Sequence, residues 1–183
     1  MKSDCKPHSL MKKRLFILIC LVPFLLLNSP AHASGIINGT ISLTMPDCQV
    51  RSGEWIRILL VRSQVEVPAL IGIEKMNPFQ RMETIRNLHM KFFIAVREKM
   101  SDSTFVVQSN LTTPEGVFQF PGVSPGTYYL IVTFPAMVKD HKVAWQVPVI
   151  VFDDQITRVE LNDGNLLMPT YTRNSTQGTR GGG

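Results

Sequence analysis

The 183-residue sequence predicts a mainly β fold, a β-sandwich or barrel of short strands with one long α-helix inserted. Three observations predict this fold class. First, β-type runs recur roughly every 8–12 residues, with Pro- and Gly-rich turns between them. Second, one segment changes to steps of three and four residues, the period of an amphipathic helix. Third, apolar residues make up 44% and charged residues 18% of the chain, which is an ordinary globular composition.

The first two predicted strands precede the helix. They span residues 36–44 and 55–61. In the second strand the side chains alternate, with Ile56, Ile58 and Leu60 on one face and Leu59 and Val61, beside Trp55 and Arg57, on the other. Because both faces of this strand are largely apolar, we expect both to be covered in the folded protein.

The predicted helix spans about residues 78–100. Asn77 and Pro78 supply an N-cap and a proline at the first helical position, and Gln80 is placed to complete a capping box. The apolar residues at steps of three and four are Phe79, Met82, Ile85, Leu88, Phe92, Val96 and Met100. We expect this helix to lie over the outside of one sheet, since apolar outer faces need a cover. The alternative is that the helix or the sheet face is an interface for a partner.

Strand character resumes after the helix. The predicted strands span residues 104–109, 117–120, 127–134, 143–152 and 156–161, and Pro121-Gly122 and Pro125-Gly126 are predicted turns. Within 127–134 the residues Tyr128, Leu130, Val132 and Phe134 share one face, whereas Tyr129 and Ile131 share the other. Pro148 cannot donate a ladder hydrogen bond, so it predicts an edge strand or a bulge. Residues 170–183 have no apolar period, and we expect them to be disordered.

Residues 1–33 have the pattern of a signal peptide. Lys12-Lys13-Arg14 precedes an apolar run over residues 15–27, and Ala31-His32-Ala33 matches a cleavage site. The run is shorter than the roughly 20 residues that span a bilayer, although an uncleaved anchor is the alternative. We therefore expect an exported protein, periplasmic or extracellular, which contacts the membrane only through the signal peptide before cleavage. Residues 34–169 then form the β-sandwich domain, with the helical insertion at 65–103.

Charge and cysteine content exclude some classes of function. From residue 34 onward there are 14 Lys and Arg against 13 Asp and Glu, scattered along the chain, so no nucleic-acid partner is expected. Cys48 is the one cysteine after residue 33, which excludes an intrachain disulfide in the mature chain. We expect Cys48 to be buried, with pairing between chains as the alternative.

One stretch resembles a known family. Thr112 to Phe134 contains Gly-Val-Phe-Gln-Phe followed by Pro-Gly-Thr-Tyr-Tyr-Leu-Ile-Val, and this resembles the carboxypeptidase regulatory-like domain. The resemblance implies a seven-stranded, transthyretin-like antiparallel sandwich, grouped with carbohydrate-binding-like folds and usually non-catalytic. The chain departs from the family pattern where the insertion at 65–103 replaces a short link, and where residues 48–54 replace the usual first hairpin.

The sequence shows no catalytic or metal motif. His89 and His141 are expected at the surface, and they and Cys48 do not have the spacing of metal ligands. We therefore expect that the protein binds no metal and no cofactor and is not an enzyme. Trp55, Tyr129 and Trp145 are candidate residues for stacking on sugar rings. The alternative is that both tryptophans belong to the core or lie beneath the helix.

The function expected from the sequence is that of an exported, non-catalytic β-sandwich module acting in binding or assembly in the cell envelope, with an unidentified protein or glycan partner. Two alternatives stay open. One is a carbohydrate-binding module. The other is an accessory subunit that docks on a larger envelope complex through the inserted helix.

Overall fold

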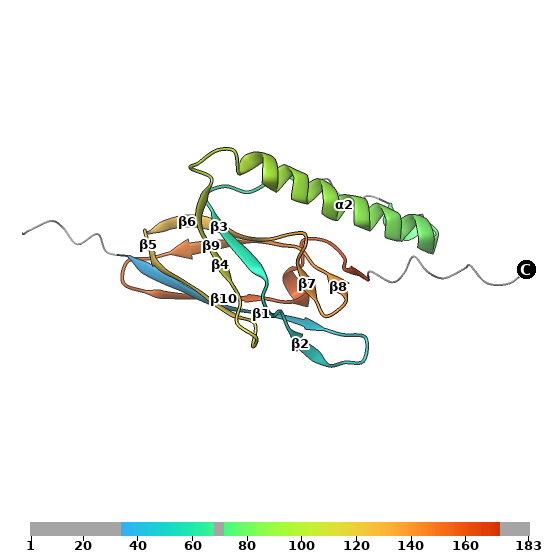
Figure 1. Ribbon diagram of the computed structural model, residues 1–183, viewed down its shortest axis with the longest axis horizontal. Coiled ribbons are helices and arrows are strands. Elements are labelled where there is room, and N and C mark those ends of the chain that lie inside the picture. The colour runs from blue at the N-terminus through green and yellow to red at the C-terminus, as the bar shows by residue number, and fades with distance from the viewer. Residues whose placement is uncertain (1–33, 68–71, 173–183) are drawn as a thin grey trace, which may run out of the picture. The chain divides into compact units, whose positions relative to one another are not determined.

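The computed structural model describes residues 34–67 and 72–172, and Figure 1 shows that they form three layers. Helix α2 is the outer layer, a four-stranded sheet lies beneath it, and a second sheet closes the far side. The predicted mainly β sandwich with one inserted helix is therefore confirmed. Residues 1–33, for which we predict a signal peptide, lie outside the described residues.

The sheet away from the helix, here called the bare sheet, has the order β10-β1-β5, with a short β2 paired to the end of β1. Its strands are β1 (Gly35–Thr44), β2 (Val50–Ser52), β5 (Val117–Val123) and β10 (Ile156–Leu161). β2 and β5 run antiparallel to β1, whereas β10 runs parallel to it. The parallel pair departs from the expected antiparallel pattern because β10 follows a strand of the other sheet, so no hairpin with β1 sets its direction.

The sheet beneath the helix, here called the covered sheet, is antiparallel and has the order β4-β3-β6-β9. Its strands are β3 (Arg57–Val61), β4 (Val106–Leu111), β6 (Gly126–Val132) and β9 (Trp145–Val151). Pro148 lies in β9 at the edge of this sheet, as predicted. Across the two sheets, seven strands of the described chain have five or more residues, the strand number that the family resemblance implies.

A small third sheet has the order β11-β8-β7 and is built from β7 (Met137–Val138), β8 (His141–Lys142) and β11 (Tyr171–Thr172). β11 corrects the prediction of disorder over residues 170–183 at the start of that segment. Tyr171 and Thr172 pair with β8 through the backbone, and such pairing needs no apolar periodicity. Residues 173–183 lie outside the described residues. Two 3₁₀ turns complete the described elements, η1 (Ile73–Lys75) and η2 (Asp163–Asn165).

Helix α2 (Pro78–Lys99) has nearly the bounds that the sequence predicts. The Asn77 Oδ1 atom accepts a hydrogen bond of 2.9 Å from the Gln80 backbone N–H, so the predicted N-cap is present. Within residues 34–67 and 72–172, no helix has both the length and the apolarity needed to span a membrane.

The apolar side chains form two clusters, one on each face of the covered sheet. Between the two sheets lie Ile37, Ile41, Ile58, Leu60, Phe118, Phe120, Tyr128, Leu130 and Trp145, with other buried residues. Between the covered sheet and α2 lie Leu59, Val61, Ile131, Leu88, Phe92 and Val96, with others. The expectation that the helix covers the outside of one sheet is confirmed, so the inner face of α2 already has its partner within the chain.

Two local predictions are wrong. Pro121-Gly122 is a bulge inside β5 and not a turn, since Gly122 has φ 65° and the pairing with β1 shifts register nearby. The strand continues because Val123 packs into the core, where it is 1% exposed. Cys48 is exposed rather than buried, because the β1–β2 turn carries it outward with φ 61°.

Candidate functional site

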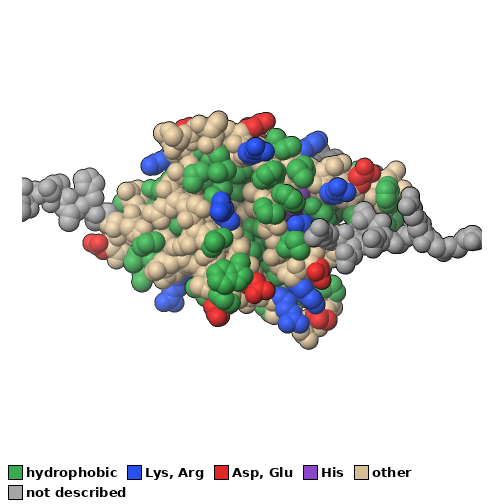
Figure 2. All heavy atoms as spheres, in the orientation of Figure 1, with side chains coloured by type: hydrophobic (Ala, Val, Ile, Leu, Met, Phe, Trp, Pro, Cys, Tyr) green, Lys and Arg blue, Asp and Glu red, His purple; other side chains and the backbone are tan. Residues whose placement is uncertain are grey.

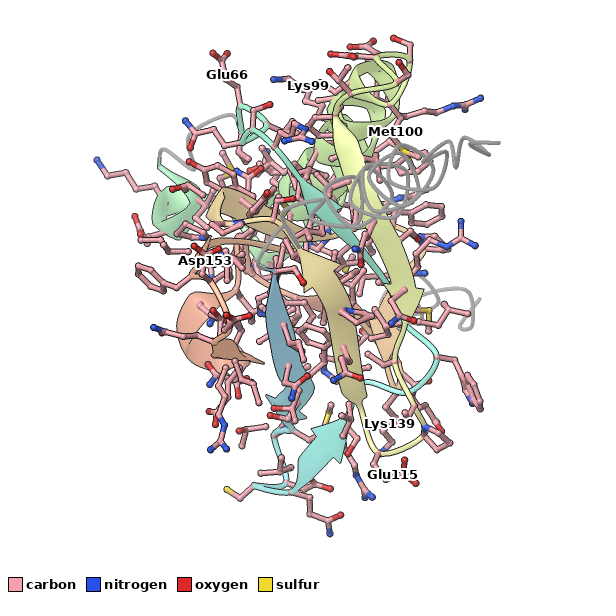
Figure 3. The ribbon with its side chains drawn as sticks, turned by 90° about the vertical axis from the view of Figure 1, so that its left-hand side faces the viewer. Glu66, Lys99, Met100, Glu115, Lys139 and Asp153 are labelled. Carbon is pink, nitrogen blue, oxygen red and sulfur yellow. The ribbon has the colours of Figure 1, made fainter. Side chains whose placement is uncertain are left out.

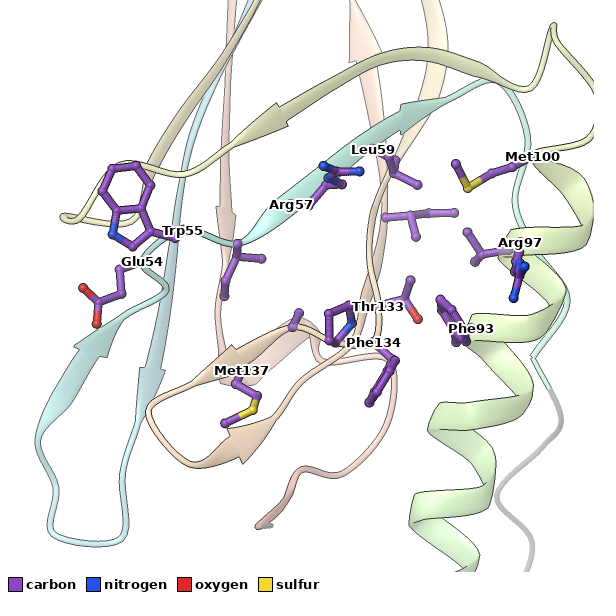
Figure 4. Close-up of a pocket in the computed structure, with 15 residues that line it drawn as sticks. Glu54, Trp55, Arg57, Leu59, Phe93, Arg97, Met100, Thr133, Phe134 and Met137 are labelled. Atoms are coloured by element: carbon purple, nitrogen blue, oxygen red, sulfur yellow. The ribbon is translucent and has the colours of Figure 1, made fainter.

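A groove opens between the C-terminal half of α2 and the strands beneath it, as Figure 4 shows. We call it the α2 groove. Its volume is about 520 Å³, within the range of about 300–1,000 Å³ that is usual for small-molecule sites. In the surrounding surface, Figure 2 shows hydrophobic side chains gathered where α2 meets the strands, with Lys and Arg side chains between them.

The floor of the α2 groove is the outer face of the covered sheet. Leu59 of β3 and Ile131 of β6 are directly paired across the ladder, and both belong to the cluster beneath α2. The residues on either side of each in its strand point into the other cluster, between the sheets. The alternation that predicted two apolar faces in these strands therefore also sets the apolar floor.

One wall of the groove is a flank of α2. Phe93, Val96, Arg97 and Met100 follow one another at steps of three, one and three, which places them on one side of the helix. Figure 3 shows Met100 at the end of α2, at the opposite end of the molecule from Glu115 on the β4–β5 turn. The groove therefore lies beside the last turns of the helix.

The opposite wall is the segment from Thr133 to Met137. The Phe134 ring meets the Phe93 ring of α2 edge to face, with centroids 5.4 Å apart and planes at 64°. The sequence places Phe134 on the same face as Tyr128, and this prediction is wrong. β6 ends at Val132, so the alternation stops there and the chain turns toward the helix.

The mouth of the groove carries Trp55, which is 65% exposed and has φ 55°, a left-handed conformation that costs free energy for any residue with a Cβ atom. The buried Thr112 holds the turn in place. Its Oγ1 atom accepts a 2.8 Å hydrogen bond from the Ile56 N–H and donates a 2.6 Å bond to the Gly53 carbonyl oxygen. Backbone strain of this kind clusters at functional sites, so the conformation of Trp55 makes it a candidate binding residue.

The charged groups of the groove lie at different places along it. In Figure 4, Glu54 lies beside Trp55, Arg97 lies near Met100 at the helix end, and Arg57 lies between them. Within the described residues neither guanidinium has an ion pair or a hydrogen bond. The Thr133 Oγ1 atom is buried and also has no hydrogen-bond partner within that part of the chain. The groove thus combines an apolar lining with two unpaired cations and an unused hydroxyl group.

The three candidate stacking residues do not form a platform. Trp55 lines the groove, but Trp145 is fully buried between the sheets, where its Nε1–H donates a 3.0 Å hydrogen bond to the Asn162 carbonyl oxygen. Trp145 therefore offers no face to a ligand. Tyr129 is half-buried and packs against the cluster beneath α2. The alternative that both tryptophans lie in the core or beneath the helix holds for Trp145 alone.

His89 is buried rather than at the surface, with 3% of its side chain exposed. Its ring packs edge to face on Tyr171 at 5.0 Å, and its Nε2 atom donates a 2.9 Å hydrogen bond to the Pro169 carbonyl oxygen. Burial lowers the pKa of His89, the Pro169 bond opposes this shift, and the nearby charge of Lys142 lowers the pKa further. His89 thus attaches the segment before β11 to the helix, and it lies outside the α2 groove.

His141 lies in β8 and is half-buried, whereas the sequence places it in a surface loop. Its Nδ1 atom is buried, and no hydrogen-bond partner for it is found in the described chain. No group of three or more His, Cys, Asp or Glu side chains suited to a metal ion occurs in residues 34–67 and 72–172.

A second hollow, of about 360 Å³, lies on the bare sheet. Its lining mixes polar side chains, Asn38, Gln119, Arg158 and Glu160 among them, with the apolar Val117, Phe118 and Val159. It is more open than the α2 groove, so it encloses less of any ligand.

No family model matches the chain, and no curated protein matches it either. Two solved structures show a distant likeness, each with a TM-score of 0.41. A minor pilin of Streptococcus agalactiae has 10% identity over 71% of this chain, which spans 44% of the pilin's length. A suggested carbohydrate-binding protein of Pseudomonas aeruginosa has 18% identity over 74% of this chain and 92% of its own. Likeness at this level assigns neither a family nor a function, so the resemblance of residues 112–134 stays a prediction.

Sequence reasoning found one side chain of the groove, Trp55, and missed the others. Arg57 carried a usable signal, since it is a charged residue on an otherwise apolar strand face. Arg97 and Thr133 carried none, because each looks like an ordinary polar residue beside a helix or strand end. Only the packing of α2 across β3 and β6 brings them to one hollow.

Proposed function

We propose that this chain is an exported, non-catalytic binding module of the cell envelope, and that the α2 groove is its binding site. The groove itself supports this proposal. It is an apolar hollow of about 520 Å³, framed by a helix inserted between two strands, with an exposed tryptophan at its mouth. Ligand sites in proteins typically combine such an apolar lining with a few convergent polar groups.

The lining supports binding rather than catalysis. General acid–base and nucleophilic mechanisms need a base within hydrogen-bond reach of the reacting group. The groove is lined by one carboxylate, Glu54, and by no histidine or cysteine, and the Thr133 hydroxyl has no hydrogen-bonded base beside it among the described residues. Export rests on the signal-peptide pattern of residues 1–33.

The structure bears differently on the two alternatives, a carbohydrate-binding module and an accessory subunit that docks through the inserted helix. A sugar presents many hydroxyl groups that need hydrogen bonds, and the groove offers four polar side chains among fifteen, which disfavours carbohydrate. Docking on a larger complex through the inner face of α2 is disfavoured because that face packs on the covered sheet. The outer flank of α2 leaves the assembly hypothesis open, since Phe79, Met90 and Ile94 are 67%, 39% and 46% exposed there. The sequence places Phe79 on the apolar face of the helix, and this prediction is wrong.

A neutral, apolar fluorescent probe tests the groove as a binding site. We expect N-phenyl-1-naphthylamine to bind the intact purified protein, and Phe93→Asp to weaken that binding at least about tenfold by placing a charge in the lining. Ile156→Asp is the matched control, because Ile156 is 57% exposed on β10 of the bare sheet and lies outside the groove. Equal probe binding by all three proteins would reject the site, and circular dichroism checks that each variant is folded.

Export is tested separately. Cell fractionation combined with mass spectrometry should recover a mature chain that begins at Ser34 outside the cytoplasm. A chain that keeps residues 1–33 and stays in the cytoplasm would contradict the proposed location without affecting the binding site.

A further inference from the structure

We infer that the α2 groove binds a single-chain amphiphile with an anionic head group, such as the carboxylate of a medium-chain fatty acid. This inference rests on the proposed function and adds the chemical class of the ligand. Three features of the groove lead to it, namely the apolar floor and walls, the two unpaired arginines, and the unused hydroxyl of Thr133.

The lining requires an apolar ligand body. Leu59 and Ile131 form the floor, and the Phe93 and Phe134 rings close over one side. A peptide would bring backbone N–H and C=O groups into this lining, where most would stay without partners. A hydrocarbon chain carries no such groups. Met100 and Met137 border the groove, and their flexible side chains can adapt to a chain of variable length.

The charges require an anionic head group. Arg57 comes from β3 and Arg97 from α2, so two elements of the fold each present a cation to the same groove. Neither has an ion pair within the described residues, so both are available to a ligand. A guanidinium binds carboxylates and phosphates through paired hydrogen bonds. A ligand anion therefore supplies the partner that both arginines lack.

The positions of the charges also orient the ligand. Glu54 lies beside Trp55 at one end of the groove, whereas Arg97 lies at the helix end, as Figure 4 shows. Repulsion from Glu54 keeps an anionic head away from the mouth at Trp55, and attraction by the arginines holds it toward the helix. The hydrocarbon chain then runs along the floor toward the indole ring.

Thr133 provides the third feature. Its Oγ1 atom is buried without a hydrogen-bond partner in the described part of the chain, and buried polar groups in proteins nearly always have one. A carboxylate oxygen in the groove would accept a hydrogen bond from the Thr133 hydroxyl, and a hydrogen bond to a charged acceptor is stronger than one to a neutral acceptor.

Tryptophan fluorescence reports binding through Trp55. Of the two tryptophans in the chain, Trp55 lines the groove, whereas Trp145 is fully buried between the sheets and cannot contact the ligand. The intact protein is titrated with monomeric laurate, dodecylammonium and dodecanol, three ligands that share a chain length and differ in charge. We expect laurate to bind most tightly and dodecylammonium least tightly. Decanoate should bind about fifteenfold more weakly than laurate, since it has two methylenes fewer and each buried methylene contributes about a fourfold change in affinity.

Variants locate the head group. Arg57→Gln and Arg97→Gln should each weaken laurate binding about fivefold and leave dodecanol binding unchanged. Thr133→Val should likewise weaken laurate selectively. Arg158→Gln is the matched control, because Arg158 lies on the bare sheet and its substitution removes the same charge outside the groove. Equal affinity for laurate and dodecylammonium, or an equal loss in Arg158→Gln, would overturn the inference.

Two further outcomes tell a wrong ligand class from a wrong binding site. If dodecanol and the neutral probe bind while laurate gains nothing from its charge, the groove is a binding site but the ligand class is wrong. If none of the ligands binds, the proposed function itself fails.

Co-sedimentation with phosphatidylglycerol vesicles tests a membrane lipid as the source of the anionic head group. If the protein sediments with the vesicles and laurate does not release it, the groove is not the anion site. If laurate releases the protein, the groove is supported as the anion site, with a membrane lipid as the source of the ligand.

Discussion

The two sheets of the sandwich share one core but differ in their outer faces. The outer face of the covered sheet presents Leu59, Val61 and Ile131, and the chain places α2 over it. The outer face of the bare sheet presents polar side chains such as Thr40, Gln119 and Arg158, which reach water. An apolar outer face therefore requires a cover, and the inserted segment supplies it.

The groove follows from the same difference. α2 is a straight element laid across a sheet, and toward its last turns the space between Phe93, Met100 and the strands is not filled by side chains. The bare sheet offers no second wall, so its hollow is more open than the α2 groove. The cover stabilises the fold where it packs tightly and leaves a binding site where it does not.

The largest expected effect tests the cover. Phe92→Ala removes a side chain that is 0% exposed between α2 and the covered sheet, and we expect it to lower the free energy of unfolding by about 3–5 kcal/mol. Val117→Ala, on the outer face of the bare sheet and 42% exposed, should change it by less than about 0.5 kcal/mol. Urea denaturation measures both. A loss below about 1 kcal/mol for Phe92→Ala would mean that the helix is not part of the core.

A smaller effect is expected inside the bare sheet. Gly39 faces the core, and a Cβ atom there would lie 2.6 Å from the Val159 carbonyl oxygen and against the Phe118 ring. We expect Gly39→Ala to cost about 2 kcal/mol by overpacking, again by urea denaturation. Gly164→Ala is the control, since a Cβ atom at residue 164 would lie 3.2 Å from its nearest neighbour, Asn162 Oδ1. This substitution should lower the free energy of unfolding by less than about 1 kcal/mol. An equal loss of unfolding free energy in Gly39→Ala and Gly164→Ala would show that the core between the two sheets tolerates the added methyl group.

Acid should weaken the covered side of the molecule. Burial holds the pKa of His89 below the value of about 6.5 expected in the unfolded chain. The stability of the neutral form is therefore fully present above about pH 6.5 and is lost as the pH falls from there through the lower folded pKa. Hydrogen bonds from Thr104 lower the pKa of Asp102, so the contribution of that carboxyl is lost only below about pH 4.

Thermal melts between about pH 8 and pH 5 measure this effect. We expect the Tm to decline over that range in the wild-type protein and in His141→Gln. In His89→Gln the decline should be much smaller, because the titrating group is gone. An unchanged decline in His89→Gln would assign the pH dependence to another group.

The smallest expected change concerns the groove mouth. Trp55→Asn replaces an exposed tryptophan at φ 55° by a residue that tolerates the left-handed conformation, so stability should rise by about 0.5 kcal/mol. Binding of the neutral probe should weaken at the same time, by about threefold. Opposite signs for stability and binding would identify Trp55 as a functional side chain. A loss of both would show instead that the indole ring supports the fold.

Much of the fold could be predicted because its signals are local. The helix is marked by Asn77 and Pro78 and by the steps of its apolar residues, and its predicted bounds agree with the structure to within about a residue. The alternation in residues 55–61 separated the two clusters correctly, with Ile58 in one and Leu59 in the other. Local spacing decides which side of an element is apolar.

Predictions failed where distant contacts decide the outcome. Pro121-Gly122 has the local chemistry of a turn, yet the packing of Val123 keeps the strand going. His89 has a position on the helix that looks like the surface, and it is buried because Tyr171, 82 positions away, packs on it. Trp145 has the residue type of a stacking position, but its N–H donates to the Asn162 carbonyl oxygen inside the core.

The sequence by itself determined a mainly β fold, a sandwich or a barrel, the place of its one long helix, and the need to cover a second sheet face. Each of these follows from periodicity and turn chemistry over a few neighbouring residues. Only the tertiary structure decided that the helix covers its own chain, that the last long strand runs parallel to the first, and that Arg57, Arg97 and Thr133 share a groove. Those outcomes depend on contacts between segments far apart in the chain, and no local pattern encodes the direction in which such segments meet.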